Sequence, residues 1–210
     1  MRPEIFDFIG NLDTLLAVVL GAVLATLGGL TANWIEERRQ RKRREKDAAR
    51  FFGEVLASID LIVFGASESR KIGEPYGPIT MRMLKGARRE IEVYERNRER
   101  LFDLSDPALR ARIHIAVLRL SLPIDSALEA HDEILRLQDQ LAPNRDTDPT
   151  NDLRADARAA IDARIASNSG SRAFGFDLLG RLRPETEAIL MSLKPIAGIS
   201  FGEIAKAAKV

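Results

Sequence analysis

The sequence predicts an all-α fold: one N-terminal transmembrane helix that continues into a basic cytoplasmic helix, then an antiparallel four- to five-helix bundle. An apolar run of 22 residues without an ionisable side chain lies between Asp13 and Glu36, and a band rich in arginine follows it. Further along, apolar residues recur at helical spacing. Only 6% of the residues are aromatic, while 45% are hydrophobic and 30% charged. This composition suits packed helices with surface ion pairs better than a β-sandwich.

The same features predict the domain boundaries. A chain of 210 residues is long enough for one ordinary domain plus an accessory segment. The absence of cysteine excludes disulfides, thiolate metal sites and thiol catalysis, and it fits a cytoplasmic bulk. We expect a short exterior N-terminus at 1–13, a transmembrane helix at 14–35, a basic juxtamembrane helix at 36–50 and a cytoplasmic helical bundle at 51–210.

Residues 14–35 are long enough to cross a bilayer. As a helix they would rise about 33 Å, against a hydrocarbon core of roughly 30 Å. A cleaved signal peptide would carry its positive charges before the apolar segment, whereas here they follow it. A buried helix of a soluble core is the competing interpretation, but an uncharged run that leads into RRQRKRR is far more usual for a membrane helix.

The charge distribution predicts the orientation. Residues 1–13 carry a net charge of −2, residues 36–50 carry +4, and residues 51–210 carry −1. Because Lys and Arg resist translocation, the basic flank should stay cytoplasmic and the N-terminus should lie outside. The predicted location is the bacterial inner membrane. Trp34 lies where the apolar run meets the charges, and we expect it to act as an interface anchor.

Small residues recur at every fourth position of the apolar run, and they predict a helix–helix contact in the membrane. They would let a second copy or a partner subunit approach closely. The alternative is that such residues are simply common in membrane helices. The four positions are Ala17, Gly21, Ala25 and Gly29.

The basic band has three interpretations. It is a positive-inside signal that needs no ligand, or it attracts anionic lipid headgroups at about 1 kcal/mol per cation. Nucleic acid is the third, but no aromatic residues are interleaved and residues 51–210 are slightly acidic, so we expect no nucleic-acid partner. The first two are compatible, and both involve Arg38, Arg39, Arg41, Lys42, Arg43, Arg44 and Lys46.

The first cytoplasmic helices are predicted from apolar stripes on either side of a loop. A core-facing stripe begins at Phe51 and continues to Val63. Gly, Ser and Pro concentrated at 65–78 predict a loop. A second stripe comprises Leu84, Ala87, Ile91, Tyr94 and Leu101.

A third helix should begin at Pro107, capped by Ser105 or Asp106, and Pro123 should kink it. Residues 142–152 predict a polar loop. The sequence leaves open whether residues 152–193 form one, two or three helices, because SNSGS at 167–171 and Pro184 could each interrupt them. The expected inner faces of these helices comprise Leu109, Ile113, Val117, Leu120, Ile124, Leu128, Leu135, Leu141, Leu153, Ala157, Ala160, Ile161, Ile165, Phe174, Phe176, Leu178, Leu179, Leu182, Ile189, Leu190 and Leu193.

A search for catalytic patterns finds none, so we expect no enzyme activity and no cofactor. The motifs GxxxxGK[ST], GxSxG and HExxH are absent. His114 and His131 lie about 25 Å apart along one predicted helix, too far to share a metal. His131 would be either a pH switch or, more simply, an imidazole at the core edge with one partner. An enzyme would require carboxylates such as Glu129 and Asp132 to converge on a pocket.

The segments WIEERRQRKRREKDAAR and VYERNRERLFDLSDPALRARI resemble those of many small bacterial single-pass inner-membrane proteins of uncharacterised function with a helical cytoplasmic domain. The layout is also similar to the b subunit of F-type ATP synthases, which has an outward N-terminus, one span and a charged cytoplasmic helix. That family continues as one long polar helix, whereas this chain breaks at 65–78 and 142–152.

These observations favour a membrane-anchored, non-enzymatic scaffold or accessory subunit that binds a partner at the cytoplasmic face. The expected partners are anionic lipid headgroups and a protein, either another copy or a different chain. The alternative is a single-pass sensor whose span relays a lipid or partner state to the bundle.

Overall fold

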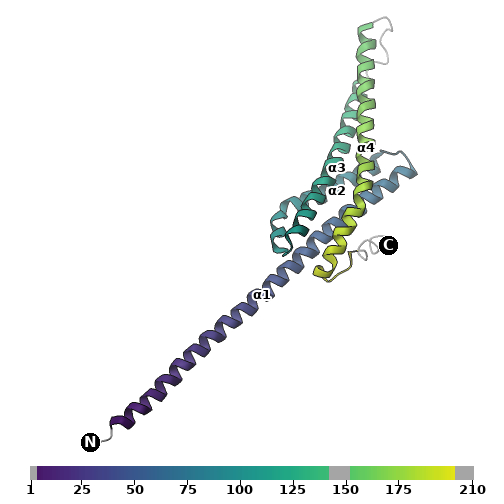
Figure 1. The fold of residues 1–210 in the computed structure, drawn as a ribbon. Helices are drawn as coiled ribbons and strands as arrows, with labels where there is room; N and C mark the ends of the chain where they lie inside the picture. The colour runs from purple at the N-terminus through teal and green to yellow at the C-terminus, as the bar shows by residue number, and fades with distance from the viewer. Residues whose placement is uncertain (1–3, 142–151, 202–210) are drawn as a thin grey trace. The chain divides into compact units, whose positions relative to one another are not determined.

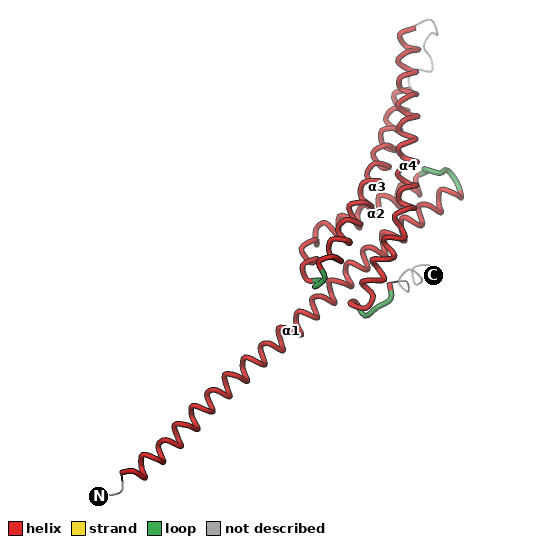
Figure 2. The backbone as a smooth tube through the Cα atoms, in the orientation of Figure 1, coloured by secondary structure: helices red, strands yellow, loops and turns green. Residues whose placement is uncertain are grey.

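The computed structural model describes residues 4–141 and 152–201, with side chains from 16–141 and 155–201. Within these ranges the chain forms helices and turns and no strand, so the predicted all-α class is confirmed (Figure 2). In chain order the elements are α1 (Glu4–Ile72), α2 (Pro78–Arg96), the 3₁₀ helix η1 (Arg98–Asp103), α3 (Pro107–Leu141) and α4 (Asp152–Ala197) (Figure 1).

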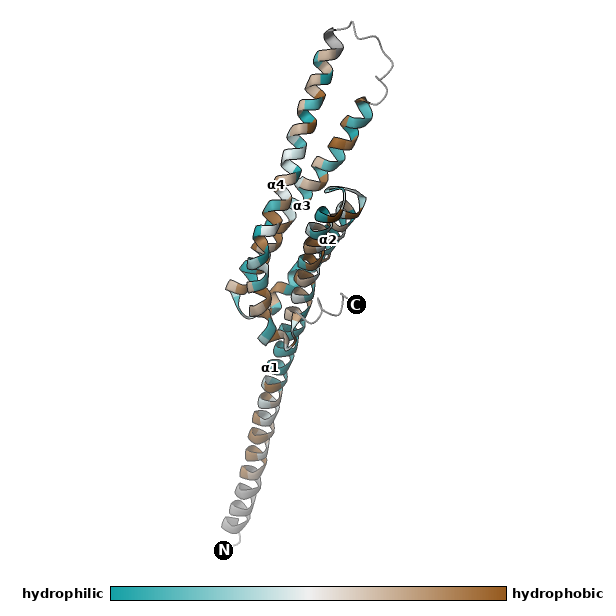
Figure 3. Ribbon diagram, turned by 90° about the vertical axis from the view of Figure 1, so that its right-hand side faces the viewer, coloured by the Kyte–Doolittle hydropathy of each residue, from teal (hydrophilic) through white to brown (hydrophobic). Residues whose placement is uncertain are grey.

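The chain divides into two compact units, residues 1–44 and residues 45–210. In the first unit, α1 carries an apolar stretch followed by a hydrophilic one, visible as brown and then teal in Figure 3. Among the described helices, α1 alone is long and apolar enough to cross a membrane, by length and composition, and none of its most apolar window is buried. The expected membrane-length helix is therefore present.

In the second unit, here called the packed unit, helices that follow one another in the chain run in opposite directions. Ser69, near the end of α1, shares a hydrogen bond of 2.7 Å with Thr80 at the start of α2. Further back along α1, the ring of Phe52 lies 5.8 Å from that of Tyr94 at the end of α2. Tyr94 in turn bonds His114 near the start of α3. Each turn thus reverses the chain.

Helix α4 lies against both α3 and α1. Arg119 of α3 pairs with Glu185 at 2.6 Å. On the other side, Asp60 of α1 pairs with Arg183 at 2.9 Å. Figures 1 and 3 both show α3 and α4 side by side. Helix α4 is therefore held to the part of α1 inside the packed unit as well as to α3.

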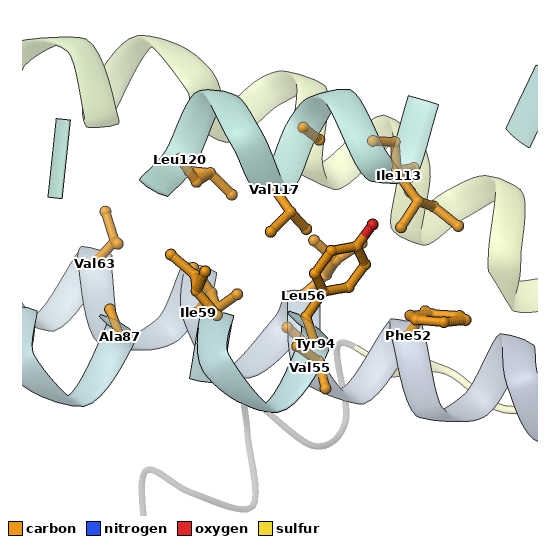
Figure 4. Close-up of a cluster of buried hydrophobic side chains, with 14 of the residues drawn as sticks. Phe52, Val55, Leu56, Ile59, Val63, Ala87, Tyr94, Ile113, Val117 and Leu120 are labelled. Atoms are coloured by element: carbon orange, nitrogen blue, oxygen red, sulfur yellow. The ribbon is translucent and has the colours of Figure 1, made fainter. Parts of the chain in front are cut away.

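The core of the packed unit lies where these helices meet, and apolar residues at spacings of three and four supply it. In Figure 4, side chains from α1, α2 and α3 point toward one another. Most of the predicted core positions are buried, which confirms the periodic assignment. The largest fully buried side chains are Tyr94, Phe52, Leu56, Ile59, Leu84, Ile91, Leu104, Ile113, Ile124, Leu137, Leu179 and Ile189.

The end of α4 returns to α1. Gly198, with φ of +67°, ends the helix in a conformation that favours glycine. The Arg50 Nε donates to the Ala197 carbonyl at 3.0 Å. Phe201 is 4% exposed, and its ring fills the space that a side chain at Gly53 would need. The last described residue is thus packed against the first turns of the packed unit.

The prediction of a loop at 65–78 is wrong in its first half, because α1 continues to Ile72 and only residues 73–77 form the turn. The two serines that favoured a loop bond back into the helix. The Ser67 Oγ donates to the Val63 carbonyl at 2.9 Å, and the Ser69 Oγ donates to the Ala66 carbonyl at 2.8 Å. Their hydroxyls are satisfied without breaking the helix.

The second predicted helix ends before Leu101, the last residue of its predicted apolar stripe. Helix α2 stops at Arg96, and Leu101 lies in η1, although it is buried as expected. Asn97 is the C-cap, with its backbone N–H donating to the Tyr94 carbonyl at 3.0 Å. Its side chain donates to the Val93 carbonyl at 2.8 Å, which satisfies another carbonyl of the last turn.

Residues 152–197 form one helix, α4, so neither SNSGS nor Pro184 interrupts it. The Asn168 side chain donates to the Arg164 carbonyl at 3.0 Å inside the helix. Pro123 likewise lies inside α3. Burial of one apolar face along α3 and α4 outweighs the local preference of these residues to break a helix.

Several expected core positions beyond Leu128 are wrong. Leu135 is 47% exposed and Phe174 is 64% exposed, and Ala157 and Ala160 are also exposed. Ile134 and Leu137 are buried in place of Leu135. For Leu135, Ala157 and Ala160 the reason is that α3 and α4 continue past the α1–α2 turn (Figure 1). Phe174 lies level with that turn, but on another face of α4 from Arg172 and Phe176, which both contact Tyr76. Of the loop predicted at 142–152, residues 142–151 lie outside the described residues, as does the Leu153 side chain, and Asp152 begins α4.

Candidate functional site

The predicted basic band forms an exposed part of α1. Its side chains are exposed at all seven predicted positions, from Arg38 to Lys46. Among the described residues, none of these seven cations lies in an ion pair within 4.0 Å. The nearby carboxylates are occupied differently: the Gln40 side chain contacts Glu36 at 3.4 Å, and Glu45 bonds Ser105. The positive charge is therefore available to an external anion.

Glu45 connects α1 to the start of α3. The backbone N–H of Ser105 donates to its carboxylate at 3.0 Å, and the Ser105 hydroxyl bonds the same oxygen. Asp106 then caps α3, accepting from the Ala108 N–H at 2.8 Å. Of the two capping candidates, Asp106 holds the helix and Ser105 holds Glu45.

Trp34 is 60% exposed at the end of the apolar stretch. The guanidinium carbon of Arg38 lies 5.0 Å from the centre of its ring, which is a cation–π distance. An apolar ring with a cation on one face is the arrangement that suits the boundary between hydrocarbon and headgroups.

The predicted helix–helix contact residues Ala17, Gly21, Ala25 and Gly29 lie on α1 and are exposed. Apart from the adjacent residues and the backbone of α1 itself, no atom lies within 4 Å of the position that a Cβ would take at Gly21 or Gly29. This part of α1 therefore presents small side chains without any covering group from the described chain.

The hydroxyl groups within the apolar stretch are satisfied inside the helix. The Thr26 Oγ1 donates to the Ala22 carbonyl at 2.8 Å, and the Thr31 Oγ1 donates to the Gly28 carbonyl at 3.0 Å. Neither threonine hydroxyl therefore needs a polar partner from outside the helix. A helix in hydrocarbon must satisfy its polar groups internally in this way.

The histidines and acids of α3 do not assemble a reactive centre among the described residues. His114 bonds the Tyr94 hydroxyl at 2.9 Å, and burial raises the pKa of Tyr94 to about 12. Glu129 is exposed, and Asp132 lies 3.9 Å from Lys85 on the surface. No group of three or more His, Cys, Asp or Glu that could hold a metal occurs in the described part of the chain.

A cluster that the sequence did not reveal lies at the α1–α2 turn and is here called the arginine–tyrosine cluster. It comprises Arg70 of α1, Tyr76 of the turn, His131 of α3, and Arg172 and Phe176 of α4. The guanidinium carbon of Arg172 lies 3.9 Å from the centre of the Tyr76 ring. Arg70 donates to the Tyr76 hydroxyl at 3.0 Å, and its guanidinium carbon lies 4.7 Å from the Phe176 ring centre. Side chains from α1 and α4 thus meet at one tyrosine of the turn.

His131 completes the arginine–tyrosine cluster. Its Nδ1 lies 3.0 Å from the Arg172 Nη1, so the partner of this histidine is a cation rather than a carboxylate. Burial, and then Arg172, hold the pKa of His131 below its usual value. Burial also lowers the pKa of Arg172, whose buried Nε has no acceptor among the described residues. These contacts join residues far apart in the chain, so no local motif could have indicated them.

No protein-family model, curated protein or solved structure matches the chain in the comparisons made. Its function is therefore argued from its own residues and contacts.

Proposed function

We propose that the protein is a non-enzymatic scaffold or accessory subunit anchored in the bacterial inner membrane, with its N-terminus outside and its bulk in the cytoplasm. In this proposal the packed unit is an antiparallel helical bundle that binds a partner at the cytoplasmic face. The observation that carries it is the apolar window of α1, none of which is buried, next to a band of exposed cations.

The exposed leucines of α1 support the anchor. Leu20 is 63% exposed, Leu24 61% and Leu30 61%. In water these side chains would remain unburied, whereas at the centre of a membrane helix each leucine contributes roughly −0.3 to −0.6 kcal/mol to insertion. The internally bonded threonine hydroxyls support the same environment.

Charged substitutions in the middle of the span test the anchor. Replacing Leu20 and Leu24 together by arginine should shift the protein from the membrane to the soluble fraction, because each arginine opposes insertion by about 2.5 to 3.5 kcal/mol. The matched control replaces both leucines by isoleucine and should remain in the membrane after an alkaline wash. Deletion of residues 1–35 is an independent check. A protein that stayed on the membrane unchanged in both cases would refute the anchor.

The orientation can be tested with single cysteines, because the chain has none of its own. In intact cells whose outer membrane admits the reagent, an inner-membrane-impermeant maleimide should label an Asn11→Cys variant. It should label Ser126→Cys, at an exposed position of α3, only after the inner membrane is opened. Labelling of position 126 before opening would reverse the proposed orientation.

Contact through the small residues can be tested by disulfide crosslinking in membranes. Gly21→Cys should crosslink to a second copy, or to a partner carrying a cysteine, more efficiently than Val23→Cys. The two positions lie on nearly opposite sides of the helix, at 100° per residue. Equal crosslinking at both positions would indicate random collision rather than a specific face.

A further inference from the structure

We propose that His131 and Arg172 form a proton-sensitive latch that holds the α1–α2 turn against α4 and opens when His131 takes up a proton. This inference concerns the far end of the packed unit from Glu45 and does not depend on the proposed membrane anchor.

The turn is held chiefly through Tyr76. Arg172 stacks on the ring at 3.9 Å, and the ring meets that of Phe176 edge to face at 5.5 Å. Both residues belong to α4, so the turn is fixed to α4 by its one aromatic side chain. Arg70 approaches the same ring from α1, at 4.9 Å, and donates to its hydroxyl.

Arg172 can hold its position only while His131 is neutral. A guanidinium donates hydrogen bonds and accepts none, so the His131 Nδ1 must offer a lone pair to the Arg172 Nη1 at 3.0 Å. The neutral imidazole then carries its proton on Nε2. Protonation of Nδ1 removes the acceptor and places two cations in contact, which converts an attraction into a repulsion.

The charges that face His131 come from every element around it. Arg172 of α4 and Lys85 of α2 disfavour its protonation, whereas Asp132 of α3 and Glu74 of the turn favour it. Lys85 and Asp132 lie 3.9 Å apart and partly offset each other. Burial acts most strongly and, with Arg172, lowers the pKa of His131. The latch should therefore be closed at neutral pH and open in acid, below the usual histidine pKa of about 6.5.

Once His131 is charged, the contact that still holds Arg172 among the described residues is its stacking on the Tyr76 ring. Within the described residues it has no carboxylate within ion-pair distance, and its Nε is already without an acceptor. Arg70, by contrast, keeps Asp177 at 3.8 Å. We therefore expect Arg172 to leave Tyr76 for solvent and the turn to open locally, while α1 stays in place.

Hydrogen exchange in the turn is the direct test, on the full chain in a nanodisc. The probes are the amides of Gly77 and Met81, which donate to the Glu74 and Gly77 carbonyls, each at 3.1 Å. After correction for intrinsic exchange, their protection should fall by about tenfold or more between pH 7.5 and pH 5. Unchanged protection in the wild type would overturn the proposal.

Three variants assign the effect to the latch. His131→Gln keeps an acceptor for Arg172 but cannot be protonated, so protection should persist at both pH values. In Arg172→Met the turn should be open, and its amides poorly protected, at both pH values. His114→Gln removes the only other histidine and should keep the wild-type response. A pH response that survives in His131→Gln would refute the assignment.

A measurement on the wild type avoids reliance on any variant. The imidazole of His131 can be titrated by NMR, and its midpoint should coincide with the midpoint of the exchange change. Two separate midpoints would refute the latch. None of these results would alter the outcome of the fractionation experiments, so the two proposals can fail independently.

Discussion

At the scale of single residues, Arg183 joins α4 to α1 by the best-formed ion pair between the two helices. Its Nε and Nη2 donate to the two carboxylate oxygens of Asp60 at 2.9 and 3.0 Å. The guanidinium also lies 4.8 Å from the Phe64 ring centre, and the hydrogen bonds to Asp60 raise the pKa of Arg183. A two-pronged contact of this kind fixes the rotation of α4 as well as its position.

Asp60→Ala should lower the free energy of unfolding by about 1 to 2 kcal/mol. The expected loss is moderate because the side chains of Arg183 and Asp60 are still 31% and 16% exposed, so solvent screens the pair. Chemical denaturation monitored by circular dichroism measures the change. In a double-mutant cycle, Arg183→Ala should cost less in the Asp60→Ala background than in the wild type; additive losses would mean that the pair does not interact.

The buried Tyr94 should make the folded state less stable in strong alkali. Burial raises its pKa from 10.0 to about 12, so the folded state keeps a proton that the unfolded state has lost between these values. The contribution of this group is fully present below pH 10 and is lost as the pH rises toward 12. Absorbance of tyrosinate should show a step near pH 12 that disappears in Tyr94→Phe and persists in Tyr76→Phe. A wild-type titration complete by pH 10.5 would contradict the assignment.

At the scale of helices, α4 crosses α3 at a glycine. A Cβ at Gly175 would lie 2.9 Å from the carbonyl oxygen of Pro123 and 3.5 Å from the Ala127 Cβ. The first neighbour is backbone, so it cannot rotate away as a flexible side chain would. Glycine at this position is therefore what allows the two helices to approach closely.

Gly175→Ala should lower the free energy of unfolding by about 1 to 3 kcal/mol, since the helices must move apart. Gly180→Ala is the matched control on the same helix, because nothing lies within 4 Å of its Cβ position. It should raise stability by up to about 1 kcal/mol through better helix propensity. Thermal unfolding of the two variants should thus shift in opposite directions, and a shared direction would contradict the close approach.

Periodicity predicted which residues of these helices are buried, but not where the helices end. Leu84, Ala87 and Ile91 were placed correctly because burial of one face at helical spacing is a local pattern. The break expected at 65–78 rests on Gly, Ser and Pro, and composition does not show that the Ser67 and Ser69 hydroxyls bond to carbonyls inside α1. The stripe places the exposed Leu135 in the core because it does not reveal where the neighbouring helices stop. It also places Phe174 there, although Phe174 lies on another face of α4 from the buried Phe176.

The candidate anchor could be predicted because its signal is one of local composition. The apolar run and the basic band are adjacent in the chain, and both can be read without knowing the fold. The arginine–tyrosine cluster could not, since Tyr76 and Arg172 meet only after α3 and α4 have reversed the chain. The sequence indicates His131 as a possible switch but does not show that its partner is Arg172.

At the scale of the whole molecule, the main hydrophobic core lies entirely within the packed unit. Every residue of this core falls between Ala48 and Phe201. Helix stability in such a unit comes mainly from tertiary packing, and none of the packing that forms this core involves the apolar stretch of α1.

A fragment of residues 45–210 should therefore fold on its own. Its circular dichroism should be strongly helical, and it should unfold cooperatively in denaturant, as a single packed core predicts. A fragment starting at Leu61, which lacks Phe52, Val55, Leu56 and Ile59, is the control and should not unfold cooperatively. A gradual transition for the longer fragment would show that the first unit contributes to the core.

Glu45, Arg50 and Gly53 belong to neighbouring turns of α1, and each contacts a residue far along the chain: Ser105 before α3, Ala197 at the end of α4, and Phe201 just beyond it. A pulling force that enters the chain at residue 45 would therefore be divided at once among three attachments. Those attachments would be loaded in parallel rather than ruptured one after another. Single-molecule stretching from residue 45 should therefore give one high rupture event rather than a series of smaller ones.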